Sequence, residues 1–134
     1  MRYDPTDLPP DALAFLAEHV LASLTTPTAN GAPHVVPVGF TYDATEGLAR
    51  VITSGTSQKV RNIERASADS LPVVALCQVD AGRWLTLMGT ATIARDPERI
   101  AIAVAKYEAR YRTPRENPGR VAIEIAVTSV MGRA

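Results

Sequence analysis

Short apolar runs separated by turn sequences dominate the chain. In its first half the pattern predicts strands over residues 21–26, 34–42 and 48–53. Asn30-Gly31 and Thr45-Glu46-Gly47 are typical turn sequences and stand between these runs. Because short turns join consecutive antiparallel strands, we expect the three to form a meander.

The second half predicts three more strands, over residues 71–79, 83–94 and 121–130. Ala81-Gly82 is a tight turn between the first two, and the third alternates apolar and polar positions. Six strands of even spacing with few helices indicate a small antiparallel barrel. At 134 residues, without a linker or an internal repeat, the whole chain 1–134 is expected to be one domain.

Helical periodicity is confined to short segments. Apolar residues recur at helical spacing over residues 11–19, and a short basic helix is expected after Ser57. A third helix should begin at Asp96-Pro97-Glu98, because Asp is a favoured N-cap and Pro is favoured at the first helical position. The apolar stripe of this third helix contains Ile100, Val104, Tyr107 and Tyr111.

The junction between the third strand and the basic helix carries the strongest functional signal. An apolar run ends at Thr53, Ser54 and Gly55, and hydroxyls follow at Thr56 and Ser57. The helix then presents four polar or basic side chains: Lys59, Arg61, Asn62 and Arg65. Main-chain N–H groups and the positive end of a helix dipole favour an anion, and Lys and Arg add charge-assisted hydrogen bonds. The pattern predicts a phosphate site, although Lys59 and Arg61 on a merely solvated helix face remain an alternative.

Charge and composition narrow the classes of function. The 14 basic and 14 acidic residues balance, which argues against general nucleic-acid binding. Cys77 is the only cysteine, so no disulfide can form within the chain, as is usual in reducing compartments. No apolar run has the length of a membrane span, and the first residues lack the apolar core of a signal peptide. A cytoplasmic protein without a membrane segment is expected.

Side chains for catalysis or metal binding are sparse. His19, His34 and Cys77 are far apart in the sequence and predict no metal site, and no nucleophile–base arrangement or carboxylate pair is legible. The sequence therefore assigns no catalytic residue. Chemistry carried by a bound cofactor fits this sparseness, because the protein then needs only to bind and orient.

Four segments together resemble one superfamily of oxidoreductases. They are PHVVPVGFTYD, ARVITSGTSQKVRNIER, QVDAGRWLTLMGTATI and YRTPRENPGRVAIEI. The chain resembles the pyridoxamine-phosphate-oxidase-like superfamily of FMN-binding split β-barrels, in particular the actinobacterial branch that uses coenzyme F420. The resemblance implies a mainly β, six-stranded split barrel that forms a homodimer, with deazaflavin sites shared between subunits.

The resemblance also implies roles for individual residues. Lys59, Arg61 and Asn62 match positions that hold the cofactor phosphate, and Thr53, Ser54 and Ser57 match positions near the ribityl chain and phosphate. The main chain of Pro37 and Val38 would face the ring system. Gln78 and Trp84 would border the ring from the facing subunit, although Trp84 as an ordinary packing residue is equally compatible with the sequence.

The implied activity is hydride transfer from reduced F420 to a conjugated acceptor, with biliverdin as the expected substrate. A basic segment over residues 106–120 is a candidate lid, in which Arg110, Arg112 and Arg115 would bind substrate carboxylates. These cations could instead meet the oligoglutamate tail of F420 or simply be solvated. An FMN-dependent oxidase or reductase, and a carrier of F420 or a tetrapyrrole without catalysis, are the alternative functions.

Overall fold

The computed structural model describes residues 1–68 and 70–134. This part of the chain forms eight strands and three helices. In chain order they are β1 (Arg2–Tyr3), α1 (Pro10–Ala17), β2 (Ala22–Pro27), β3 (Pro33–Val38), β4 (Thr41–Asp43), β5 (Leu48–Ser54), α2 (Gln58–Ala66), β6 (Val73–Asp80), β7 (Arg83–Ala94), α3 (Pro97–Arg110) and β8 (Arg120–Arg133).

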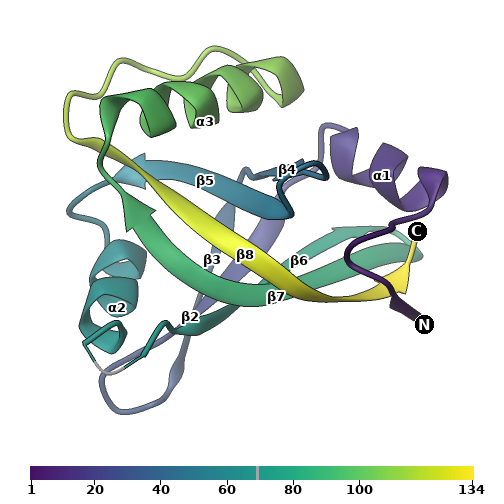
Figure 1. Ribbon diagram of the computed structural model, residues 1–134, viewed down its shortest axis with the longest axis horizontal. Coiled ribbons are helices and arrows are strands. Elements are labelled where there is room, and N and C mark those ends of the chain that lie inside the picture. Colours follow the sequence, from purple (N-terminus) through teal and green to yellow (C-terminus); the bar gives the residue numbers. More distant parts are fainter. Residues whose placement is uncertain (69) are drawn as a thin grey trace.

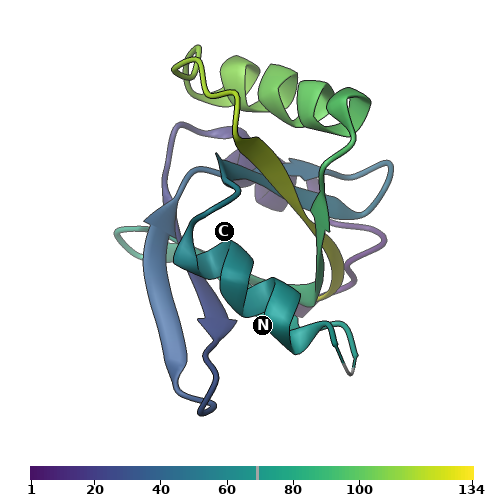
Figure 2. The ribbon, with the colours of Figure 1, turned by 90° about the vertical axis from the view of Figure 1, so that its left-hand side faces the viewer.

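One antiparallel sheet contains all the strands, in the order β3-β2-β6-β7-β8-β5-β4, with β1 added beside β8. The long strands β7 and β8 bend strongly, so the sheet curls around an apolar interior (Figures 1 and 2). Fully buried side chains from five strands fill this interior, among them Leu24, Val51, Leu76, Leu87 and Ile125. The predicted mainly β barrel is confirmed, with eight strands in place of six.

The expected meander is wrong. The predicted strand 34–42 is divided at Gly39 and Phe40 into β3 and β4, which lie at opposite ends of the strand order. β5 pairs with β4 and β8 but not with β3, because β8 runs along the whole length of β5, from Leu48 to Ser54. A periodic apolar pattern shows that a segment is extended but does not say which strand pairs with it.

The helices lie on the outside of the barrel. α2 covers one end of it and contacts β2 and β7, while α3 lies along β5 and β8 (Figures 1 and 2). The start of α3 is confirmed: Asp96 is the N-cap, its Oδ1 accepts a hydrogen bond of 3.1 Å from the Glu98 amide, and Pro97 follows.

The expected helix 11–19 is shorter, because Glu18 is already extended. His19 therefore lies beyond the end of α1, where its ring packs edge-on against Tyr111 at 5.2 Å between centroids. No helix in the described ranges is long and apolar enough to cross a membrane.

Candidate functional site

A basic cavity lies where β3 ends, between β5, the first turn of α2 and the segment that follows α3. Its volume is about 400 Å³. The chain reaches it from four separate stretches of sequence. The lining residues are Pro37, Val38, Gly39, Ile52, Thr53, Lys59, Tyr107, Arg112, Thr113, Pro114, Arg115, Asn117 and Arg120.

The basic cavity carries positive charge without acidic neighbours. Its lining has four cations, Lys59, Arg112, Arg115 and Arg120, and no carboxylate. Within the described part of the chain, none of the four has a carboxylate oxygen within 4.0 Å. Burial lowers the pKa of the Lys59 ammonium below its ordinary value, because a partly buried cation loses hydration. A bound anion would compensate this cost.

A turn rich in hydroxyls lies next to the cavity, between Thr53 and the start of α2. The Thr53 hydroxyl lies 3.3 Å from the Ser57 hydroxyl, and those of Ser54 and Thr56 are 3.4 Å apart. Ser57 is the N-cap of α2, but its side chain does not bond to the helix amides, so the cap leaves N–H donors of the first turn to other partners. An oxyanion beside Lys59 would meet both the cation and the positive end of α2.

The lining also includes four residues with largely apolar side chains, Pro37, Val38, Ile52 and Tyr107, which we call the apolar wall. Gly39 lets this wall form, because a Cβ there would lie 2.9 Å from Cε2 of Tyr107. A flat ring system can lie against such side chains while an anionic chain meets the cations of the same cavity. The residues present therefore fit a long ligand that is apolar at one end and anionic at the other.

The structure brings six of the predicted site residues to the basic cavity: Pro37, Val38, Thr53, Lys59, Arg112 and Arg115. Ser54 and Ser57 belong to the adjacent turn without lining it, and Arg61 is exposed on α2 outside it. Trp84 lies on β7 opposite Val79, away from this cavity.

Three predicted ligand residues have other partners. Asn62 is buried and joins α2 to β2, donating to the Thr26 hydroxyl at 3.0 Å and accepting from Gln58 at 2.8 Å. Gln78 has no exposed surface. The Arg110 guanidinium donates to Gln78 and to three main-chain carbonyls, so it faces the interior instead of the basic cavity.

Several lining residues were not predicted as ligand contacts. Tyr107 was assigned only to the apolar stripe of its helix, and Gly39 and Asn117 lie in loops without a charge signal. Arg120 belongs to the predicted basic segment, and its guanidinium donates to the Arg115 carbonyl, which folds that segment back on itself. The described residues contain no group of three His, Cys, Asp or Glu side chains that could hold a metal ion.

Comparison with known proteins gives the same family for nearly the whole chain. The family model of pyridoxamine 5′-phosphate oxidase matches residues 8–133. A curated relative from Mycobacterium tuberculosis, named F420H(2)-dependent biliverdin reductase, is 49% identical over 129 residues, which cover 96% of this chain and 90% of the relative.

Solved structures share the fold. One named F420 reductase superposes with a TM-score of 0.72 at 26% identity and covers 92% of this chain and 98% of its own. The haem storage protein HutZ from Vibrio cholerae superposes with a TM-score of 0.73 at 20% identity, over 94% of each chain. The same barrel therefore occurs in proteins that are named for different ligands.

Proposed function

This chain belongs to the pyridoxamine 5′-phosphate oxidase family, and on that premise we propose that it is a coenzyme F420-dependent reductase acting on a conjugated acceptor, with biliverdin as the substrate. The observation that carries the proposal is the basic cavity, whose lining combines the apolar wall with four cations that have no carboxylate within 4.0 Å among the described residues. The relative named F420H(2)-dependent biliverdin reductase, at 49% identity, supports the choice of cofactor and substrate.

The proposed roles follow from the placement of each side chain. Lys59 and the start of α2 hold the phosphate, with the Thr53 hydroxyl beside it. The main chain of Pro37 and Val38 and the Tyr107 ring bound the space for the ring system. Arg112 and Arg115 bind carboxylates, either the propionates of biliverdin or the oligoglutamate tail of the cofactor.

When bound, the reduced deazaflavin supplies the hydride from its C5 position. The side chains that line the basic cavity include no His, Cys, Asp or Glu among the described residues. The protein therefore contributes binding, orientation and partial exclusion of water, and the proton that completes the reduction comes from water or from a substrate propionate.

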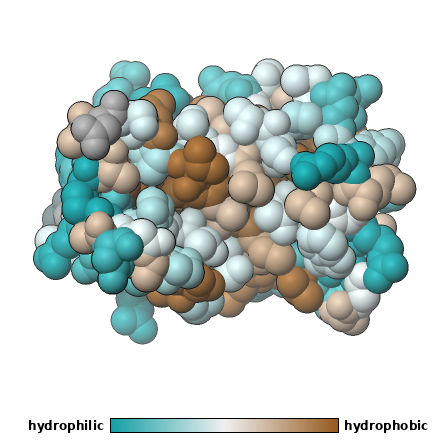
Figure 3. All heavy atoms as spheres, turned by 90° about the horizontal axis from the view of Figure 1, so that it is seen from below, coloured by the Kyte–Doolittle hydropathy of each residue, from teal (hydrophilic) through white to brown (hydrophobic). Residues whose placement is uncertain are grey.

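A second copy of the chain is proposed to cover an outer face of the sheet, which we call the apolar face. Its exposed side chains come from β2, β3, β6 and β7, where Val35 is opposite Thr25, Thr25 opposite Ala75, and Ala75 opposite Met88. Large exposed apolar residues on or beside it are Leu21, Val35, Val73, Val79 and Met88. Figure 3, which views the molecule from below, shows several hydrophobic patches, in brown, on the face in view. An exposed patch of this kind marks an interaction site.

The apolar face is continuous with the basic cavity. Pro37 lines the basic cavity and also a shallow hollow on the apolar face, together with Val35, Cys77 and Val79. A partner subunit seated there would complete the wall of the cofactor site, and Trp84, opposite Val79, would lie at that contact. We place the homodimer in the cytoplasm, in keeping with the free thiol of Cys77.

A titration of the purified protein with oxidised F420 and, in parallel, with FMN tests the cofactor, with fluorescence as the signal. We expect micromolar binding of F420 and much weaker binding of FMN, followed by bilirubin formation when reduced F420 and biliverdin are mixed with the protein. Preference for FMN would indicate a flavin enzyme. Binding of F420 without turnover of biliverdin or other conjugated acceptors would indicate a carrier.

Affinity for F420 should fall at alkaline pH. Lys59 attracts the phosphate only while its ammonium group carries a proton. Burial lowers the pKa of this group below the ordinary 10.5, so the attraction is lost as the pH rises through the lowered pKa. In the free protein the same group has the opposite effect: stability rises over this range, because the unfolded chain keeps the proton longer. Titrations between pH 7 and 10 measure the affinity. The Lys59→Arg variant should keep its affinity to higher pH, and a parallel loss in both proteins would contradict the assignment.

A further inference from the structure

Arg110, at the last turn of α3, is bonded in a way that the ligand role does not explain. Its guanidinium makes four hydrogen bonds, to the carbonyls of Glu18 (2.8 Å), Val20 (3.2 Å) and Phe40 (2.5 Å) and to Oε1 of Gln78 (2.7 Å). These acceptors belong to the C-cap of α1, the loop before β2, the junction of β3 with β4, and β6. A guanidinium has five N–H groups, so it is almost fully used inside the protein.

The Arg110 guanidinium is half-buried and, among the described residues, has no carboxylate oxygen within 4.0 Å. Gln78 is completely buried, and its amide N–H also donates to the Phe15 carbonyl at 2.7 Å. The nearby carboxylate of Glu18 is taken by Arg83, at 2.7 and 3.0 Å. Desolvation lowers the pKa of Arg110, which means that the protein bears a cost to keep this charge among neutral acceptors. A half-buried charge held by several acceptors fixes their relative positions, whatever its net contribution to the free energy of unfolding.

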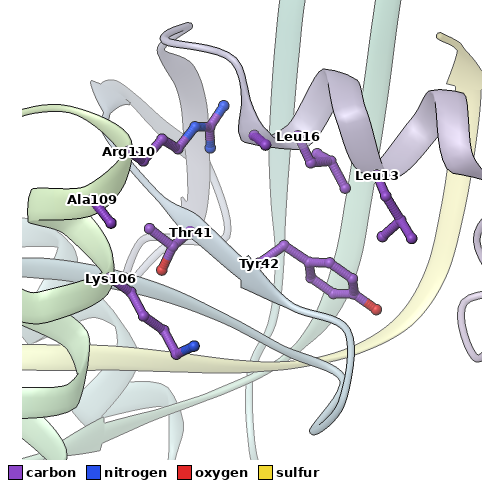
Figure 4. Close-up of a pocket in the computed structure, with 8 residues that line it drawn as sticks. Leu13, Leu16, Thr41, Tyr42, Lys106, Ala109 and Arg110 are labelled. Carbon is purple, nitrogen blue, oxygen red and sulfur yellow. The ribbon is translucent and has the colours of Figure 1, made fainter.

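Tyr111, the next residue, forms hydrogen bonds with two of the same residues, Val20 and Phe40. Its hydroxyl donates to the Val20 carbonyl at 2.8 Å and accepts from the Phe40 amide at 3.3 Å. The Arg110 guanidinium lies over both aromatic rings, 4.7 Å from the centroid of Phe40 and 4.9 Å from that of Tyr111. Figure 4 shows Arg110 directed from α3 towards the end of α1, whereas Lys106, one turn earlier, points to another side.

Two walls of the basic cavity meet at this cluster. Pro37 and Val38 of the apolar wall run through Gly39 directly into Phe40, and residues 112–115, which carry two of the cavity's arginines, follow Tyr111. The contact is close, since a Cβ on Gly39 would be 2.9 Å from Tyr107 and 3.1 Å from Tyr111. A displacement of Arg110 or Tyr111 would therefore move both walls together.

We propose that Arg110, supported by Gln78 and Tyr111, is a positioning residue that fixes the main chain of residues 37–40 against the basic segment 112–115 and so sets the width of the cofactor site. This inference rests on the proposed function for its effect on F420, but its effect on the main chain does not depend on any ligand.

The first measurement is amide hydrogen exchange of the free protein, comparing wild type with the Arg110→Met and Tyr111→Phe variants. We expect exchange over residues 38–41 to rise by about tenfold or more in Arg110→Met and by a smaller factor in Tyr111→Phe, which loses a single hydroxyl. Arg110→Lys should restore part of the protection. Lys106→Met is the matched control on the same helix and should leave this segment unchanged. If Arg110→Met does not fold, Tyr111→Phe and Arg110→Lys carry the same comparison.

A core variant separates positioning from general stability. Ile125→Ala removes a fully buried side chain of β8, opposite Ala49 and Ala91, and loosens the barrel, while Ile125 takes no part in the hydrogen bonds of the cluster. The inference is wrong if exchange over residues 38–41 rises as much in Ile125→Ala as in the cluster variants. It is also wrong if exchange over these residues rises in no variant.

The second measurement is the dissociation constant of F420 and the rate of hydride transfer at saturating cofactor. In Arg110→Met we expect the affinity for F420 to fall by about tenfold and hydride transfer to become slower. Both values should be unchanged in Lys106→Met. Exchange that rises while F420 affinity and transfer stay at wild-type values would overturn the role at the site. If wild-type protein fails to bind F420, the proposed function falls, and the exchange comparison alone decides the inference.

Discussion

Replacing Lys59 with alanine should weaken the binding of coenzyme F420 by about 10- to 100-fold while leaving the fold intact. Lys59 is partly buried in the basic cavity and, among the described residues, has no carboxylate within 4.0 Å, so a phosphate would be its first anionic partner. A hydrogen bond to a charged group contributes about 1.5–3 kcal/mol, and about 1.4 kcal/mol corresponds to a tenfold change in affinity. Fluorescence titration measures the affinity.

The chain offers a matched control, because Lys106 is its only other lysine. Lys106 lies 3.5 Å from Asp43 and outside the basic cavity, so Lys106→Ala should bind F420 within about twofold of wild type. Urea unfolding of both variants checks that any loss of affinity does not come from unfolding. If Lys59→Ala and wild type bound F420 with equal affinity, the phosphate would not bind at this end of the cavity.

Introducing a charge on the apolar face should separate the proposed dimer and weaken the cofactor site at the same time. Val35 is 56% exposed on β3, two residues before Pro37, which belongs to both the apolar face and the basic cavity. In a dimer the Val35→Glu variant would bury an unpaired carboxylate at the contact, which costs several kcal/mol. We expect a monomer by light scattering, with F420 affinity lower by about tenfold or more.

Ile102→Glu is the control for this prediction. Ile102 is 44% exposed on α3, away from the apolar face, so the same change of chemistry should leave both the mass and the F420 affinity unchanged. A Val35→Glu protein that stays dimeric would place the interface elsewhere. A monomer that still binds F420 as tightly as wild type would mean that one chain holds the whole site.

The sequence predicts the elements whose signals are local. The strand 83–94 follows a tight turn at Ala81-Gly82 and agrees with β7, and Asp96 and Pro97 fix the start of α3. The division of 34–42 was not predictable in this way, because its two halves pair with different strands, β2 and β5, which are themselves placed by the distant strands β6 and β8. Pairing between distant segments leaves no trace in the periodicity of either one.

The same contrast between local and long-range signals separates the predicted site residues that lie in the basic cavity from those that have partners elsewhere. Lys59 belongs to a pattern with a local meaning, a turn of hydroxyls before a helix, and it lies in the basic cavity. Gln78 and Arg110 carry the same donors as a ligand-binding pair, but their partners are main-chain carbonyls of Phe15, Glu18, Val20 and Phe40. A sequence shows which side chains can donate, and only the fold shows which acceptors they meet.

The central place of β8 has a consequence for biosynthesis. β8 joins β7 on one side to β5 on the other, so without it β3-β2-β6-β7 and β5-β4 are two separate pieces of sheet. Neither piece can close the barrel while residues 120–133 are still inside the ribosome. Until β8 has emerged, the nascent chain would expose the core-facing sides of both pieces, so we expect the need for chaperone protection to be greatest before residues 120–133 leave the ribosome.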